Sequence, residues 1–184
     1  MLFRSRNLGV HAIIHAEISW LTAQGFSARR DRVLVMAAGI APDVDALSLL
    51  GGTEAYSRYH HVLFHGYAGA LITAALCAAF ARKRLAVAAL ALVAFHLHLL
   101  CDLAGSGPGW GLSYFWPTSS QEWFWTGQWG LASWQNSIIG MSVTVATLAC
   151  ALVFRRTFVE VFSLRADAKV VEALRLRFLK KKSA

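Results

Sequence analysis

Long apolar runs separated by short basic clusters dominate the chain. Three of these runs, residues 62–81, 85–101 and 137–154, contain no Asp, Glu, Lys or Arg. A helix needs about 20 apolar residues to cross the hydrocarbon core of a membrane. The three runs therefore predict three membrane-spanning helices.

Two further segments are apolar but interrupted by ionisable side chains. Residues 33–50 are apolar except for Asp43 and Asp45, which directly follow Pro42. Because proline removes a backbone donor and clashes with the preceding turn, we expect a helix that breaks near Pro42. Residues 8–26 are a weaker candidate. The predicted fold is all-α: a polytopic membrane helical bundle of four to five transmembrane segments over residues 1–156, then a basic cytoplasmic tail helix over 157–184.

The basic clusters predict how the helices are oriented. They lie before the second segment, between the third and fourth, and after the last: Arg29, Arg30, Arg32; Arg82, Lys83, Arg84; Arg155, Arg156. Cytoplasmic loops are enriched in Lys and Arg. If all five segments span, the three clusters share the cytoplasmic side, the loops 51–61 and 103–136 lie outside, and the C-terminus is cytoplasmic.

Composition agrees with a membrane protein. The chain is 57% hydrophobic and 15% charged, whereas soluble domains carry about 25% charged residues. Residues 155–184 hold nine Lys/Arg and three Asp/Glu, so this tail carries most of the net charge of +8. A basic tail on an apolar body indicates a multi-pass protein of the plasma membrane, with membrane lipids as partners and no nucleic acid. The oligomeric state is left open.

Two surface features each have two interpretations. Residues 166–182 place apolar side chains at helical spacing against Arg175 and three lysines. This pattern predicts an amphipathic helix that lies either on the anionic cytoplasmic leaflet or against the base of the protein. Six of the seven tryptophans fall in the outer loop 103–136. They form either an interfacial belt or a platform beside a binding site.

Ionisable residues concentrate inside the apolar segments. All seven histidines fall in or beside these segments, together with four acidic residues: His11, His15, His60, His61, His65, His96, His98; Glu17, Asp43, Asp45, Asp102. Such groups cost a few kcal/mol each at membrane depth and are usually paired and functional. A single buried histidine is readily explained as a polar contact, but four separate clusters are not.

The spacing of these residues indicates a metal site. The pairs His11–His15, His61–His65 and His98–Asp102 are each four residues apart, so each pair shares a helix face. The orientation derived from Lys and Arg alone brings all four clusters to the outer half of the membrane. Imidazole and carboxylate together suit zinc, with manganese or iron as alternatives. We therefore expect one centre with one or two divalent ions, held by the candidate ligands His11, His15, Asp43, Asp45, His60, His65, His98 and Asp102.

Three motifs carry a resemblance to a known family. The segment from Ala41 to Asp45 resembles the PD-x-D motif of the YdjM-like family of bacterial inner-membrane proteins, described as metal-dependent hydrolases. The segments 60–66 and 95–102 are similar to its H-R-x-x-T-H-S and H-x-x-x-D elements, and His11 or His15 matches its N-terminal histidine. The resemblance implies that Asp43, Asp45, His60, His65, His98 and Asp102 are ligands. The second motif departs from the family at His61, Phe64 and Gly66.

The expected function is a membrane-embedded metal-dependent hydrolase, with Asp45 and His61 as catalytic groups. The H-x-x-x-D spacing is also similar to that of zinc phospholipases C, so a phospholipid or other phosphate ester is the expected substrate. Three alternatives stay open: a bis-His haem protein, a metal transporter, and a non-catalytic membrane protein whose polar groups only hold its helices together.

Overall fold

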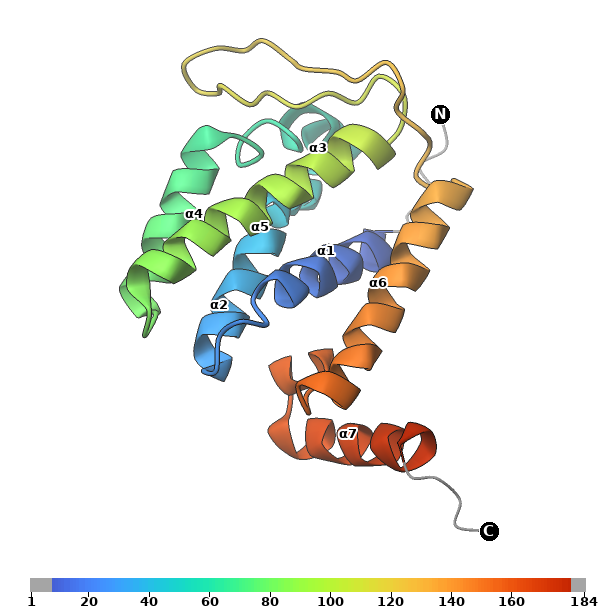
Figure 1. Cartoon of the computed structure of the whole chain (residues 1–184). Helices are drawn as coiled ribbons and strands as arrows, with labels where there is room; N and C mark the ends of the chain where they lie inside the picture. Colours follow the sequence, from blue (N-terminus) through green and yellow to red (C-terminus); the bar gives the residue numbers. More distant parts are fainter. Residues whose placement is uncertain (1–7, 180–184) are drawn as a thin grey trace.

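The structure is a computed structural model that describes the backbone of residues 8–179 and the side chains of residues 12–179. Within this part of the chain every regular element is helical, apart from one isolated antiparallel bridge between Leu112 and Trp123. The elements are α1 (Leu8–Thr22), α2 (Arg29–Ile40), the 3-10 helix η1 (Ala41–Gly51), α3 (Thr53–Tyr59), α4 (Tyr67–Phe80), α5 (Arg84–Gly105), α6 (Trp134–Val153), the 3-10 helix η2 (Phe158–Val161) and α7 (Leu164–Phe178) (Figure 1). The all-helical prediction is confirmed.

Three helical segments are long and apolar enough to cross a membrane. They are Arg29–Gly51, which joins α2 to η1, Arg84–Gly105 and Trp134–Val153. The predicted count of four to five spans is not confirmed. Helix α4 has 14 residues and is thus about 21 Å long, short of the roughly 30 Å of hydrocarbon. Helix α1, with 15 described residues, is similarly short.

Helix α4 begins later than the apolar run predicts. Residues 62–66 form turns and bends, and the helix starts only at Tyr67. The cause is a close backbone contact with the outer loop. The Tyr67 amide donates to the Tyr114 carbonyl, and a Cβ at Gly66 would lie 2.5 Å from that same oxygen. The apolar pattern could not reveal this contact. His65 is therefore a loop residue, and the prediction that His61 and His65 share a helix face is wrong.

The predicted break at Pro42 is confirmed. Helix α2 ends at Ile40, and residues 41–51 continue as a 3-10 helix with Pro42 in its first turn. The change of winding is the expected response to a residue without an amide donor. It leaves Asp45 buried and Asp43 partly exposed at the same end of the bundle.

Small side chains let the helices approach closely. The largest apolar cluster joins α2, α4 and α5 through alanines and valines, including Ala38, Ala74 and Ala94. At Gly39 the fit is tightest, because a Cβ there would lie 1.6 Å from Ser19 Oγ on α1. Close packing through small residues is typical of membrane helices.

The basic clusters gather at one end of the bundle, which we call the basic end. Asp31 on α2 accepts hydrogen bonds from the amides of Arg82 and Lys83 in the α4–α5 turn. Arg156, after α6, binds Gln24 and the Phe26 carbonyl beside the start of α2. In Figure 1, α7 lies at this end, whereas the connection between α5 and α6 crosses the opposite end, over α3 and the end of α5.

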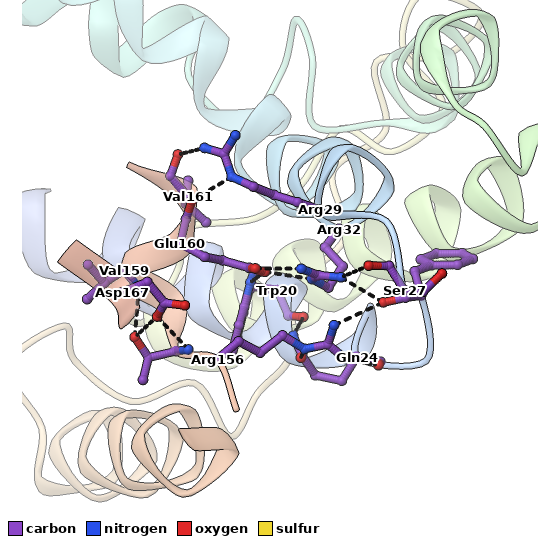
Figure 2. Close-up of polar contacts among 12 residues, drawn as sticks. Trp20, Gln24, Ser27, Arg29, Arg32, Arg156, Val159, Glu160, Val161 and Asp167 are labelled. Carbon is purple, nitrogen blue, oxygen red and sulfur yellow. Dashed lines mark hydrogen bonds and ion pairs between the residues drawn. The ribbon is translucent and has the colours of Figure 1, made fainter. Parts of the chain in front are cut away.

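A buried ion pair holds the basic end together. Arg32 and Glu160 are 3% and 1% exposed, and both Glu160 oxygens accept hydrogen bonds from the Arg32 guanidinium. Trp20 Nε1 on α1 also donates to this carboxylate at 2.9 Å, and Arg29 donates to the Glu160 carbonyl. Figure 2 shows these contacts, which we call the Arg32–Glu160 cluster. They attach η2, and through it α7, to the first two helices.

Residues 164–178 of the tail form helix α7. Ser163 caps its first turn, Asp167 accepts from the Thr157 amide and hydroxyl, and Arg175 donates to the Leu152 carbonyl of α6. The protein-facing side of α7 therefore packs on the base of the bundle. Phe178 and Leu179 remain exposed. The three lysines of the predicted amphipathic helix, Lys180, Lys181 and Lys182, lie outside the described residues.

Candidate metal centre

Four segments bring their ionisable side chains to the end of the bundle opposite the basic end. At the centre lies Asp102, near the end of α5. Its Oδ2 is 2.9 Å from His98 Nε2, 3.4 Å from His65 Nε2 and 3.8 Å from His61 Nε2. Its Oδ1 is 3.4 Å from His15 Nε2 on α1. With His60, Asp43 and Asp45, these residues form what we call the His/Asp cluster.

His98 is held by the fold so that one ring nitrogen faces the cluster. It lies one helical turn before Asp102 on α5 and is 2% exposed. Its Nδ1 is 2.7 Å from the Gly39 carbonyl, and a carbonyl only accepts, so the proton lies on Nδ1. The Nε2 lone pair then points into the cluster, 3.6 Å from Asp43 Oδ1. The Asp43 side chain is 32% exposed, so the cluster meets the surface there.

Asp45 lies behind two histidines of the loop before α4. Its Oδ1 is 2.6 Å from His60 Nδ1, and its Oδ2 is 2.8 Å from His65 Nδ1. The Phe64 amide also donates to Oδ2. A carboxylate bound in this way fixes the ring orientation and tautomer of metal-binding histidines. Asp45 is thus positioned to orient both rings, and its expected roles as a ligand and a catalytic group stay predictions.

His61 adopts an unusual backbone conformation. Its φ is 69°, a left-handed conformation that is uncommon for residues with a side chain. The Ser113 amide donates to its carbonyl, and its Nδ1 lies 3.3 Å from the Gly111 carbonyl, so the outer loop holds it in place. Burial, with the nearby His65, lowers the pKa of His61 to about 3. The ring is thus neutral, the form that binds metals.

The donor atoms fit a divalent cation. Three groups have ligand atoms within 4.8 Å of one another: His60, His61, His65; His15, His98, Asp102; and Asp43, His65, His98. Among the described residues, the buried atoms His65 Nε2, His98 Nε2 and Asp102 Oδ2 have no hydrogen-bond partner. Burying such atoms without a partner costs free energy, and a shared cation would satisfy all three. Nitrogen and oxygen donors in this mixture suit zinc, manganese or iron.

Most of the candidate residues predicted from the sequence meet in this cluster. The structure brings together His15, Asp43, Asp45, His60, His61, His65, His98 and Asp102. His11 lies on α1, but its side chain is outside the described residues. His96 lies apart, because its two ring nitrogens contact the Leu92 carbonyl and the Tyr114 hydroxyl.

Two aromatic residues line the cluster, and only one of them belongs to a segment that the sequence singled out. The Tyr56 ring, 3% exposed, stacks on His60 at a centroid distance of 4.5 Å, and Trp110 lies 5.4 Å from the His61 ring. Burial and the nearby carboxylates of Asp43 and Asp45 raise the pKa of the Tyr56 phenol, which keeps it protonated. No sequence signal distinguishes Tyr56, whereas Trp110 belongs to the tryptophan-rich loop.

Two contacts bear on the haem and transporter alternatives. Bis-His ligation needs two imidazoles that point at each other across the macrocycle. Here His15 and His98 stack face to face at 3.9 Å, and their Nε2 atoms converge on one carboxylate. At the basic end, Arg32 and Glu160 are paired and buried. The ionisable side chains of Arg32 and Glu160 are thus bound to each other, at the end of the bundle away from the His/Asp cluster.

The comparisons with known proteins give one match. A family model described as YdjM inner membrane protein matches residues 8–165. That range includes every residue of the His/Asp cluster. No curated protein and no solved structure matches the chain.

Proposed function

The chain belongs to the YdjM inner membrane protein family, and from this premise we propose that it is a membrane-embedded metal-dependent hydrolase of phosphate esters. The observation that carries the proposal is the convergence of three buried atoms without hydrogen-bond partners, His65 Nε2, His98 Nε2 and Asp102 Oδ2. Such a site is costly for a purely structural cluster but suits one built to hold a cation.

The donor set suggests one or two ions, with zinc preferred. His15, His98 and Asp102 offer one group of ligands, and His60, His61 and His65 offer a second. When bound, divalent metal ions supply Lewis acidity that activates water near neutral pH and stabilises negative charge on phosphate oxygens.

The roles of the surrounding residues follow from their contacts. Asp45 orients His60 and His65 and has both oxygens occupied, so it does not serve as the acceptor of a proton from water. A base is most effective when its pKa lies near the working pH. His61, with its pKa lowered to about 3, is thus assigned as a ligand. Asp43 has the most exposed side chain among the ion pairs of the His/Asp cluster. We therefore expect the phosphate group of the substrate to reach the cluster on the side of Asp43.

The position of the cluster favours a lipid substrate. It lies at the end opposite Arg29, Arg32 and Arg156, which the positive-inside rule assigns to the cytoplasm. The His/Asp cluster is then at headgroup level in the outer leaflet. Phosphate and ester bonds of phospholipids lie at the same level, so a phospholipid is the favoured substrate class.

The test is hydrolysis by the purified protein with zinc, manganese or iron. Substrates are a soluble phosphate monoester, a soluble phosphodiester and vesicles of phosphatidylglycerol, each with and without a chelator. We expect metal-dependent hydrolysis that His98→Ala removes. His96→Phe, two residues away on α5 and outside the cluster, is the matched control and should retain activity. A metal-loaded, folded protein that hydrolyses none of these substrates would refute the hydrolase proposal, as would hydrolysis that the chelator leaves intact.

A further inference from the structure

A large cavity lies beside the His/Asp cluster, between α1, α5, α6 and the outer loop. Its volume is about 640 Å³, within the range of about 300–1,000 Å³ typical of small-molecule sites. It follows α6 from Asn136 to Thr144, a distance of about 12 Å along the helix axis. Trp129 and Leu131 of the outer loop line it near one end. The cavity therefore runs beside α6 for about two helical turns.

The polar side chains in the lining are already paired. Asn136 accepts from Trp129 Nε1 and donates to the carbonyls of Gly105 and Leu131. Thr144 donates to Glu17 at 3.0 Å, and Ser137 donates to the Ser133 carbonyl. What remains to contact a ligand is chiefly apolar, including Ile14, Leu97, Leu100 and Met141. This lining suits a hydrocarbon chain and offers little to a polar ligand.

His15 belongs both to the wall of the cavity and to the His/Asp cluster. This buried residue lines the cavity, stacks on His98 at 3.9 Å and lies 3.4 Å from Asp102. On the other side, Leu100 and Met141 are 59% and 65% exposed. In a membrane these side chains face lipid hydrocarbon. A lipid can therefore enter laterally and keep its headgroup at the cluster.

We propose that this cavity binds an acyl chain of the lipid substrate while the phosphate headgroup lies at the His/Asp cluster. The inference rests on the proposed function and adds to it a specific site for the hydrocarbon part of the substrate. The occupant is one acyl chain, because the volume, the apolar side chains of the lining and the paired polar side chains of α6 all fit a flexible apolar chain.

A second apolar cavity lies on another side of α5. It has a volume of about 390 Å³ and is lined by His96, Leu99 and Leu103 together with Tyr114. His96, which belongs to this cavity, is not part of the His/Asp cluster. The second cavity thus lacks the shared lining residue that supports the proposal for the first.

Binding can be tested without relying on turnover. The probe is phosphatidylglycerol with a diazirine in one acyl chain, incorporated with the full-length protein into vesicles and activated by light. We expect cross-links at Leu97, Leu100, Ile139 or Met141, all of which line the cavity. Ala104→Phe fills the cavity from α5. Ala89→Phe, at an exposed position on the same helix outside the cavity, is the matched control.

Ala104→Phe should reduce labelling of these residues and raise KM for the vesicle substrate about tenfold, the effect of losing room for roughly two methylene groups. KM for a soluble phosphodiester should not change, and Ala89→Phe should behave as the wild type. Labelling that is equal in both variants, or that is spread evenly over the lipid-facing surface, overturns the proposal. A cross-link at the cavity residues that joins two copies of the chain, in place of a lipid, also overturns the proposal.

The two proposals can fail separately. Cavity labelling that Ala104→Phe removes, in a protein that hydrolyses nothing, would support the acyl-chain site and refute the hydrolase. Metal-dependent hydrolysis of phosphatidylglycerol with unaltered kinetics in Ala104→Phe would support the hydrolase and refute the acyl-chain site. If Ala104→Phe does not fold, Ala132→Phe, which fills the cavity from the outer loop, gives the same readouts.

Discussion

The chain buries two polar clusters, one at each end of its bundle, and they differ in how their polar atoms are satisfied. In the Arg32–Glu160 cluster, both carboxylate oxygens accept from the guanidinium, and Trp20 donates as well. In the His/Asp cluster, the Nε2 atoms of His65 and His98 face Asp102 Oδ2, and none of these three atoms has a hydrogen-bond partner among the side chains of residues 12–179.

From this difference we infer that the first is a structural network and the second a binding site. The Arg32–Glu160 cluster pairs opposite charges and joins α1, α2 and η2 with direct hydrogen bonds. The His/Asp cluster instead concentrates lone pairs, and its remaining contacts orient them: Gly39 holds His98, and Asp45 holds His60 and His65. One cluster is complete with protein atoms alone, whereas we propose that a cation completes the other.

The strongest test of the comparison is to remove a ligand from the His/Asp cluster. His98→Ala should reduce the metal content of the purified protein to background, because His98 belongs to two of the three candidate ligand groups. Elemental analysis measures the effect, and circular dichroism checks that the variant is folded. Unchanged metal content in folded His98→Ala would remove the site as described.

The second largest effect is expected at the basic end. Arg32→Met leaves Glu160 buried without its partner, which costs about 3–5 kcal/mol of stability. Chemical denaturation in detergent measures this loss. Arg30→Met, at an exposed neighbouring position, is the control and should change stability little. Metal content per folded chain should stay that of the wild type, and a loss of metal in Arg32→Met would show that the two clusters are not independent.

A smaller effect should follow from Asp45→Asn. An amide can accept from one imidazole but cannot replace both carboxylate contacts, so His60 and His65 lose part of their orientation. Removing such an orienting residue typically lowers metal affinity 10–100-fold. Metal-competition titration measures the change, with Glu54→Gln on the exposed side of α3 as the control. Complete loss of metal would instead indicate that Asp45 is itself a ligand.

The smallest effect is expected at His96. His96→Phe removes two hydrogen bonds, to the Leu92 carbonyl and the Tyr114 hydroxyl. Because a hydrogen bond contributes about 1 kcal/mol to stability, the free energy of unfolding should fall by no more than that amount for each bond. Thermal unfolding measures the loss. Metal affinity should be unchanged, and a marked decrease would place His96 in the site against its observed contacts.

Much of the His/Asp cluster could be predicted from the sequence because ionisable residues inside apolar segments are conspicuous. The spacing of His98 and Asp102, the break at Pro42 and the orientation from Lys and Arg indicated that the clusters meet. The distinct role of Asp45 could not be predicted, since a carboxylate that binds two Nδ1 atoms looks the same in sequence as a ligand.

The Arg32–Glu160 cluster was missed for a different reason. Arg29, Arg32 and Arg156 were interpreted only as indicators of the cytoplasmic side, and Glu160 lies 128 residues from Arg32. A pairing over that distance leaves no local pattern. The late start of α4 was likewise invisible, because the backbone contact between Gly66 and Tyr114 involves a distant loop. Local composition predicts which side chains cost free energy when they are buried. It does not predict which distant residue binds them by a hydrogen bond or an ion pair.

The most direct test of the central claim is the metal content of the wild type beside His98→Ala and Arg32→Met, all purified without added metal. We expect one or two divalent ions per chain in the wild type and in Arg32→Met, and background levels in His98→Ala. A folded wild type that holds no metal and takes up none when zinc, manganese or iron is supplied would contradict it.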